Sequence, residues 1–549
     1  MEPSIAERLR ELTALFNSPN ACTAALLCDC RDPQMLAYRI VAEDLTVQDL
    51  SYGELRAESE RFASALASLG VRPGDRVATL MGKSREYLVS LMGIWRVGAV
   101  HVPLFTAFAP SAIAYRLTGS NAKVVICDAK QQSKLAPGDD MPANPPWLVI
   151  STGAKLGGIH NFHDLVAASM VDFDAAVLGG EAPFIHIFTS GTTGNPKGVV
   201  VPIKALALFR LYAELGLGLR EDDLYWCAAD PGWAYGLYHG ILGVLATGVP
   251  GLLFEGGFTP ETTLKIIQEH GVTNFAAAPT VYRALRTSGI AAPAGLMLRC
   301  ASSCGEPLTP EVNDWALTAL GVAVHDHYGQ AEAGCVINNH HHPLLAGPLK
   351  PGAMGKPMPG LQAVILLEDR DEIAGVGEVG RVALDIQESQ LFWFGGYVGD
   401  AKKSAEKFGG SGRWYVTGDT GRMDEDGYFC FSARDDDVII MAGYRIGPFE
   451  VESVIAAHPS VAECAVIAVP DQIRGEVLEC YVVLRDGARA SESTVRDIQQ
   501  WVKVRFAAHA YPRSVHFAQA LPKTPSGKIQ RYVLRAKRLL DLQQAADVQ

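Results

Sequence analysis

Apolar, strand-like segments alternate with helix-like segments along roughly the first 340 residues, and this alternation most constrains the fold. Residues 76–80 and 123–127 are short apolar runs, whereas residues 87–97 carry apolar side chains at helical spacing. Apolar strands separated by helices are typical of parallel sheets covered by helices. We therefore predict an α/β protein with a large N-terminal domain of helix-covered, mainly parallel sheets.

The pattern changes after about residue 345. Short strand candidates now lie between Gly-rich turns, at residues 363–367, 381–385 and 428–431. They indicate a small β-rich subdomain over about 345–434. The charged run Arg434-Asp435-Asp436-Asp437 then interrupts the apolar pattern, so we predict a boundary between an N-terminal domain, 1–434, and a C-terminal domain, 435–549.

The C-terminal domain reads as a compact α+β unit. We expect a helix over 448–457, strands over 465–469 and 478–484, and a helix over 493–508. A separate core is also expected from length, because the chain has 549 residues and single cores stop growing near ~250–300 residues.

Charge and cysteine content argue against several classes of protein. The chain carries 48 Lys and Arg against 60 Asp and Glu, a net charge of −12, whereas nucleic-acid binding needs a concentrated basic face. The 11 cysteines are scattered and lack zinc spacing, so we expect reduced thiols. The run His340-His341-His342 has no flanking ligand cluster, and we expect it in a surface loop.

No segment predicts secretion or membrane insertion. The first seven residues contain acids and no apolar core, unlike a signal peptide. The most apolar stretch, 240–254, is shorter than the ~20 residues needed to span a bilayer and is broken by Gly and Pro. We expect a cytoplasmic protein.

The strongest local motif is the loop after the strand candidate 185–188. It reads Thr189-Ser190-Gly191-Thr192-Thr193-Gly194-Asn195-Pro196-Lys197. Its glycines allow backbone N–H groups to face a ligand, and four hydroxyls and one ammonium add donors. The spacing differs from a Walker A loop, in which Lys directly follows Gly. We predict that it binds a polyphosphate.

A second glycine motif, Gly375-Val376-Gly377-Glu378-Val379-Gly380, matches the dinucleotide fingerprint only in its letters. That fingerprint must follow a strand and open a helix. Here a strand candidate, 381–384, follows instead, so we predict a β-turn.

The loop 188–198 is similar to the phosphate loop of the adenylate-forming superfamily, which contains acyl-CoA synthetases, adenylation domains of peptide synthetases and firefly-type luciferases. Further motifs that resemble the family follow in order. They are Gly305-Glu306-Pro307-Leu308, Tyr328-Gly329-Gln330-Ala331-Glu332, Tyr415-Val416-Thr417-Gly418-Asp419, Arg434-Asp435-Asp436-Asp437, Gly443-Tyr444-Arg445-Ile446-Gly447-Pro448-Phe449-Glu450 and Pro522-Lys523-Thr524-Pro525-Ser526-Gly527-Lys528. The segment 230–238 looks most like medium-chain acyl-CoA synthetases and their bacterial relatives.

The resemblance implies an ATP-dependent carboxylic acid–CoA ligase. Such an enzyme joins a carboxylate to the α-phosphate of ATP with loss of pyrophosphate, and the thiol of CoA then attacks the mixed anhydride. Two anions must meet, so cations and hydrogen-bond donors are required. The implied ligands are a small carboxylic acid, ATP, Mg²⁺ and CoA.

The resemblance also assigns roles to individual residues. Glu332 matches the Mg²⁺-associated glutamate, and Lys528 matches the catalytic lysine of a mobile C-terminal domain. Asp436 matches the hinge between the two domains, and Gly443 and Tyr444 match the face used in the CoA step. The nucleotide site is implied for Thr189, Ser190, Gly191, Thr192, Thr193, Gly194, Lys197, Gly305, Glu306, Pro307, Asp326, Tyr328, Gln330, Asp419, Arg434 and Arg445.

Three positions depart from the family pattern. Ala331 stands where Thr usually precedes the Mg²⁺ glutamate, so one hydroxyl that would reach the α-phosphate is missing. Ala433 replaces a Gly, and Ile440 replaces a Lys. No charged catalytic group is lost.

The acid pocket is expected to be formed by Trp233, Ala234, Tyr235, Gly236 and Gly329. Acetyl-CoA synthetases resemble this chain but carry tryptophans at the positions of Tyr328 and Gly329, and an indole there would close the pocket. We therefore predict an acid longer than propionate: medium-chain, branched or aromatic.

Other functions remain open at this point. They are an adenylation enzyme that loads an acyl carrier protein, a luciferase-like oxidase, and a non-catalytic nucleotide sensor suggested by Ala331. The sequence around Lys528 also resembles sites of bacterial lysine acetyltransferases, which would make such an enzyme a partner and remove the same charge.

Overall fold

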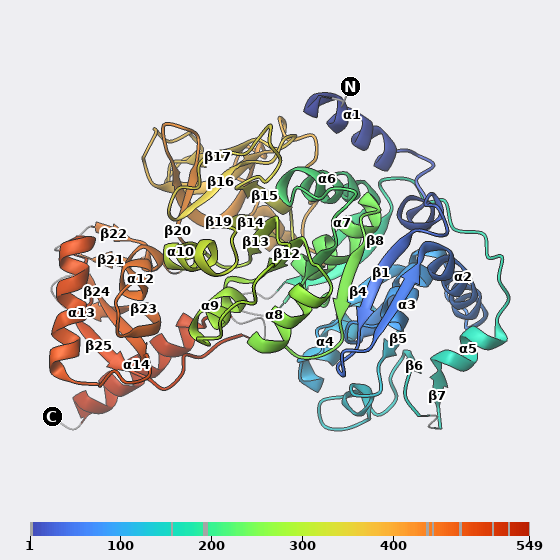
Figure 1. Ribbon diagram of the computed structural model, residues 1–549, viewed down its shortest axis with the longest axis horizontal. Coiled ribbons are helices and arrows are strands. Elements are labelled where there is room, and N and C mark those ends of the chain that lie inside the picture. The colour runs from blue at the N-terminus through green and yellow to red at the C-terminus, as the bar shows by residue number, and fades with distance from the viewer. Residues whose placement is uncertain are drawn as a thin grey trace.

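The computed structural model describes residues 4–154, 157–189, 196–434, 437, 439–441, 444–471, 475–507, 510–524 and 528–547. The strands form three sheets, and helices pack around them (Figure 1). The expected α/β architecture is confirmed.

The seven-stranded sheet has the order β7-β6-β5-β3-β4-β8-β9. Its strands are β3 (Arg76–Leu80), β4 (Val100–Pro103), β5 (Ala122–Cys127), β6 (Leu148–Ser151), β7 (Ile159–Asn161), β8 (Pro183–Thr189) and β9 (Lys197–Pro202). All neighbours pair in parallel except β8 and β9, which are antiparallel. The parallel pairing agrees with the apolar strand segments of the sequence.

The thirteen-stranded sheet has the order β17-β18-β19-β20-β16-β15-β14-β13-β12-β10-β11-β1-β2. Its strands are β1 (Leu36–Val41), β2 (Val47–Ser51), β10 (Tyr225–Cys227), β11 (Gly251–Phe254), β12 (Asn274–Ala277), β13 (Cys300–Cys304), β14 (Val324–Gln330), β15 (Gly334–Asn338), β16 (Ala353–Pro357), β17 (Ala363–Leu366), β18 (Gly380–Asp385), β19 (Trp414–Met423) and β20 (Phe429–Arg434). Along this order, every pair of neighbours between β14 and β1 is parallel. The pair β1–β2 at one end, and all pairs from β14–β15 to β18–β17 at the other, are antiparallel. The β-rich segment therefore continues the large sheet through β16 and is not a separate sheet.

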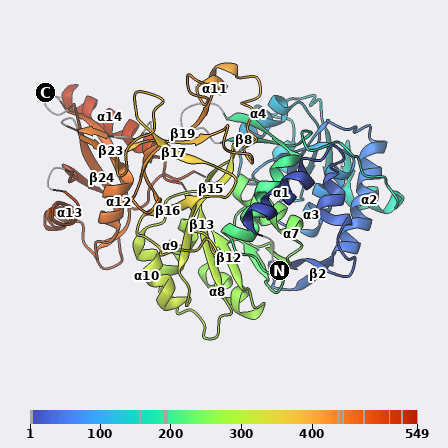
Figure 2. The ribbon, with the colours of Figure 1, turned by 90° about the horizontal axis from the view of Figure 1, so that it is seen from above.

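Helices of the first 434 residues pack on these sheets (Figure 2). They are α1 (Ile5–Phe16), α2 (Tyr52–Ser68), α3 (Arg85–Arg96), α4 (Pro110–Ser120), α5 (Phe162–Ala168), α6 (Leu206–Leu211), α7 (Gly243–Thr247), α8 (Pro260–Glu269), α9 (Pro279–Thr287), α10 (Pro310–Ala319) and α11 (Ala401–Ala405). α2 begins with a capping box, in which Ser51 and Glu54 satisfy each other's backbone N–H groups. α3 is buried along nearly its whole length, which explains its apolar sequence.

The C-terminal unit has its own sheet and core. Its elements are β21 (Ile439–Met441), β22 (Tyr444–Ile446), α12 (Pro448–Ala456), β23 (Val461–Asp471), β24 (Gly475–Leu484), α13 (Glu492–Arg505), β25 (Ser514–Phe517) and α14 (Arg531–Asp547). The sheet order is β22-β21-β24-β23, and β25 also pairs with β24. Figures 1 and 2 both place this unit at the far end from the N-terminal segments. The boundary at residue 435 stays a prediction, because residues 435 and 436 lie outside those described.

α12 packs against β20 where the two units meet. Nη1 of Arg422 on β19 lies 2.9 Å from Oε1 of Glu450 on α12. The rings of Phe431 and Phe449 are 6.0 Å apart. A Cβ at Gly447 would lie 2.2 Å from the carbonyl oxygen of Ser432, so only glycine permits this approach.

The structure tests two further expectations, one for the glycine motif 375–380 and one for the histidine run 340–342. The segment Gly375–Gly380 leads directly into β18 rather than into a helix, as predicted. The surface loop predicted for the three histidines is wrong: His340 is 4% exposed, and the ring of His341 stacks 3.6 Å from that of His325. Within the described ranges, no helix is long and apolar enough to cross a membrane.

Candidate active site

β8 and β9 form an antiparallel pair whose strands lie on either side of the predicted phosphate loop in the sequence. Thr189 pairs with Lys197 across these strands. Ser190, Gly191, Thr192, Thr193 and Gly194 lie outside the described residues. The ammonium of Lys197 lies 4.9 Å from the ring centroid of Tyr397, which is within cation–π range.

Tyr397 connects this loop to the predicted Mg²⁺ ligand. Its hydroxyl donates a hydrogen bond of 2.7 Å to Oε1 of Glu332. Glu332 is only 8% exposed. Burial, together with the charge of Glu332, raises the pKa of the Tyr397 hydroxyl, so it remains a donor. Sequence reasoning missed Tyr397, because a single tyrosine after Gly395 and Gly396 carries no spacing signal.

Asp419, the predicted ribose ligand, is held by three other predicted residues. Tyr328 and Gln330 donate hydrogen bonds of 2.5 and 2.8 Å to its Oδ2, and Nη1 of Arg434 lies 3.6 Å from its Oδ1. Asp419 and Arg434 are direct partners in the β19–β20 register. The hydroxyl of Tyr415 in turn donates to Oε1 of Gln330 at 2.8 Å. The carboxylate is therefore fixed before any ligand binds.

The predicted adenine turn follows β13. Gly305 has a φ of +105°, which favours glycine strongly. The carboxylate of Glu306 accepts hydrogen bonds from Thr280 and Arg283, so this side chain is used inside the protein. Pro307 follows in the turn and is half-buried.

Asp326 lies beside this turn and is electrostatically unusual. Burial raises the pKa of its carboxyl to about 8. Its Oδ2 accepts a weak hydrogen bond of 3.4 Å from the backbone N–H of Leu308. Its Oδ1 is buried and has no partner in the described part of the chain. This oxygen therefore has an unused capacity to accept a hydrogen bond.

The predicted acid-pocket segment lies between β10 and the helical turn that begins at Gly236. Trp233, Ala234 and Tyr235 are half-buried and Gly236 is buried. The indole of Trp233 packs 5.2 Å from the ring of Phe105. A Cβ at Gly236 would lie 2.2 Å from the carbonyl oxygen of Asp230, which explains the glycine.

Gly329 has a structural role that the sequence did not indicate. A Cβ there would lie 2.3 Å from the carbonyl oxygen of Gly334 and 2.7 Å from the Cα of Cys335. Any side chain would therefore disturb the β14–β15 ladder. The lack of a side chain at Gly329 is therefore not by itself a sign of a roomy acid pocket.

Further predicted site residues belong to the C-terminal unit. Lys528 is exposed, and its backbone N–H donates to the hydroxyl of Thr524 at 3.0 Å. Tyr444 and Arg445 lie on β22. Gly443 and Asp436 lie outside the described residues. No contact among described residues joins Lys528 to Glu332.

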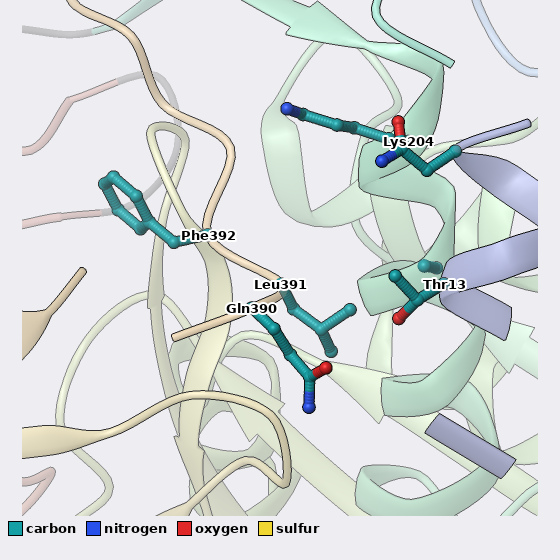
Figure 3. Close-up of a pocket in the computed structure, with 7 residues that line it drawn as sticks. Thr13, Lys204, Gln390, Leu391 and Phe392 are labelled. Carbon is teal, nitrogen blue, oxygen red and sulfur yellow. The ribbon is translucent and has the colours of Figure 1, made fainter. Parts of the chain in front are cut away.

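A shallow pocket between α1 and residues 390–392 is unrelated to this cluster (Figure 3). Thr13 and Lys204 line one side, and Gln390, Leu391 and Phe392 line the other. None of the predicted site residues lines it.

Comparison with known proteins agrees with this geometry. The AMP-binding enzyme family matches residues 32–391, and the AMP-binding enzyme C-terminal domain matches residues 450–528. An acetyl-coenzyme A synthetase of Bacillus subtilis (strain 168) is 36% identical over 491 residues, 88% of this chain and 84% of that protein.

Solved structures are similar over nearly the whole chain. A Brucella canis acyl-CoA synthetase is 39% identical, with a TM-score of 0.75 and 98% of both chains covered. The anthranilate CoA ligase AuaEII, in complex with anthranoyl-AMP, is 28% identical, with a TM-score of 0.85 over 95% of this chain and 98% of that one. The chain belongs to the AMP-binding enzymes of the adenylate-forming superfamily and, within it, to the AMP-forming acid–thiol ligases.

Proposed function

We propose that the protein converts a carboxylic acid, ATP and CoA into an acyl-CoA, AMP and pyrophosphate through an acyl-adenylate. The observation that carries this proposal is the meeting of Asp419, Arg434, Glu332 and Lys197 at one place. Two carboxylates and two cations there come from four separate segments of the chain. Such a site suits a nucleotide that carries both hydroxyls and phosphates.

The nucleotide would be held by groups that are already positioned. Asp419 accepts hydrogen bonds, so it suits the two ribose hydroxyls, and Tyr328 and Gln330 keep it in place. Lys197 and the loop before it supply donors for the terminal phosphates. The unpartnered Oδ1 of Asp326 suits the exocyclic amine of adenine.

Glu332 would hold Mg²⁺. A buried carboxylate is the hard oxygen ligand that this ion prefers, and Tyr397 occupies only one of its two oxygens. When bound, the ion neutralises phosphate charge.

The two steps would need two different placements of the C-terminal unit. Lys528 is exposed on this unit and would enter the site to bridge the acid and the α-phosphate. The segment around Gly443 and Tyr444 would replace it for attack by CoA, with Asp436 as the hinge. Arg445 would help to bind the nucleotide. Acetylation of Lys528 by a lysine acetyltransferase would then stop the first step.

The acid is proposed to be longer than propionate: medium-chain, branched or aromatic. Support comes from the half-buried segment Trp233–Tyr235 and from the likeness to a ligase of anthranilate. The relative from Bacillus subtilis carries the name of an acetate enzyme, so acetate is the direct competitor.

A screen of acids tests both levels of the proposal. Purified protein is given ATP, Mg²⁺, CoA and one acid from acetate to decanoate, or benzoate, and AMP release is measured. If a longer or aromatic acid gives more AMP release than acetate, the proposed acid class is supported. Preference for acetate refutes the acid class, and no CoA-dependent release with any acid refutes the ligase.

A further inference from the structure

We propose that Lys407 is a further nucleotide-binding residue whose ammonium contacts a phosphate oxygen of ATP. This assignment rests on the proposed function, because it assumes that ATP occupies the site around Asp419. Neither the motifs nor the spacing of the sequence points to Lys407.

The backbone around Lys407 is anchored to the strand that carries Asp419. The residue follows α11, and its carbonyl accepts a hydrogen bond of 2.7 Å from the N–H of Val416 on β19. The next side chain, Phe408, stacks on Phe394 with ring centroids 5.9 Å apart. These contacts fix the Cα of Lys407 beside the Thr417–Asp419 segment.

The ammonium reaches the centre of this segment. It donates a hydrogen bond of 2.6 Å to the carbonyl oxygen of Thr417. It would lie 3.2 Å from a Cβ at Gly418, so the glycine leaves the approach open. An ammonium has three N–H donors, and this carbonyl is its single hydrogen-bond partner among the described residues.

Lys407 is half-buried, and its ammonium has no ion pair among the described residues. Burial lowers the pKa of Lys407, and the nearby charges are the carboxylates of Glu332 and Asp419 and the cations Lys197 and Arg434. Neither carboxylate lies within 4.0 Å of the ammonium. By contrast, Lys403 on α11 is exposed and has a carboxylate partner, Glu406, at 2.7 Å.

Besides the Thr417 carbonyl, the ammonium has only the face of the Tyr415 ring, 5.8 Å from its centroid, as a partner among the described residues. A partly buried cation without a carboxylate is poorly balanced, because buried charges are normally paired. Three cations face two carboxylates in this cluster, so an anion restores the balance. The nucleotide's phosphates are the anion that the site is proposed to receive. Lys407 also supplies a donor in a site where Ala331 lacks a hydroxyl.

Binding of ATP, AMP and adenosine to the full chain, measured by calorimetry, tests the assignment. Lys407→Met should weaken ATP binding by about 10- to 100-fold, the loss of one charge-assisted hydrogen bond. Adenosine affinity should stay unchanged, because adenosine has no phosphate. Lys407→Arg should recover part of the ATP affinity, and the exposed Lys402→Met should behave as wild type.

Two outcomes overturn the assignment. Unchanged ATP affinity in Lys407→Met removes the phosphate contact. An equal loss of ATP and adenosine affinity shows that Lys407 only supports the Thr417 segment. Melting temperatures identify a variant that fails to fold. If Lys407→Met is such a variant, the ATP affinity of Lys407→Arg decides instead. Failure of the wild-type protein itself to bind ATP would instead refute the proposed function.

Discussion

The hydroxyl of Tyr397 provides a sharp test of the site. Tyr397→Phe removes the 2.7 Å hydrogen bond to Glu332 but keeps the ring under Lys197. A buried carboxylate oxygen that loses its donor costs about 1–3 kcal/mol. Displacement of a catalytic group by ~1 Å can cost ~10²-fold in rate. We therefore expect the ATP–pyrophosphate exchange rate to fall by about 10- to 100-fold, with the KM for the acid nearly unchanged.

The matched control is Tyr115→Phe. The Tyr115 hydroxyl also donates to the phosphate-loop region, at 3.2 Å to the carbonyl oxygen of Pro196, but this residue is 41% exposed. Loss of such an exposed contact should change the exchange rate by less than about threefold. Tyr397→Leu, which also removes the ring, should be worse than Tyr397→Phe. A wild-type exchange rate in Tyr397→Phe would refute the link between Tyr397 and Glu332.

Three further predictions concern other residues. Lys528→Ala should lower pyrophosphate exchange by ~10²–10³-fold but largely spare thioester formation from supplied acyl-adenylate; retention of half the exchange rate would contradict its role. Asp436→Pro should impair thioester formation more than exchange, because proline fixes φ, and equal loss in both assays would remove it as a hinge. The pKa of Asp326 rises from 3.8 to about 8 on folding, so the folded state keeps a proton that the unfolded state loses and stability falls as pH rises across this range. The stability of Asp326→Asn relative to wild type should therefore rise as pH increases from ~4 to ~8. A difference in melting temperature, measured without nucleotide, that stays constant over this range would contradict this.

Residues inside motifs could be predicted because their chemistry and order are visible in the chain. Asp419 and Arg434 belong to different motifs, yet the β19–β20 register places them opposite each other. The alternation of apolar segments likewise predicted parallel sheets, since a strand covered on both faces needs a continuous apolar run. The pairing of β16 with β20 joins strands that are far apart in the sequence, so no local sequence pattern indicates it.

Residues that act through long-range contacts could not be predicted. Tyr397 and Lys407 can be assigned a role only through their contacts with Glu332 and Thr417, which belong to other segments of the chain. The prediction for the histidine run failed for a related reason. Its polar residue types suggested an exposed loop. In the structure His340 is buried with its Nε2 3.3 Å from the carbonyl oxygen of Pro357, and the ring of His341 stacks on that of His325.

The ion pair between Arg422 and Glu450 makes the placement of the two units sensitive to salt. The side chains are 42% and 24% exposed, so dissolved ions screen their attraction. Such a pair contributes at most about 1 kcal/mol, which corresponds to a roughly fivefold change in the ratio of two domain arrangements. Rising ionic strength should thus release the C-terminal unit from this position, and the two half-reactions should respond to salt to different degrees.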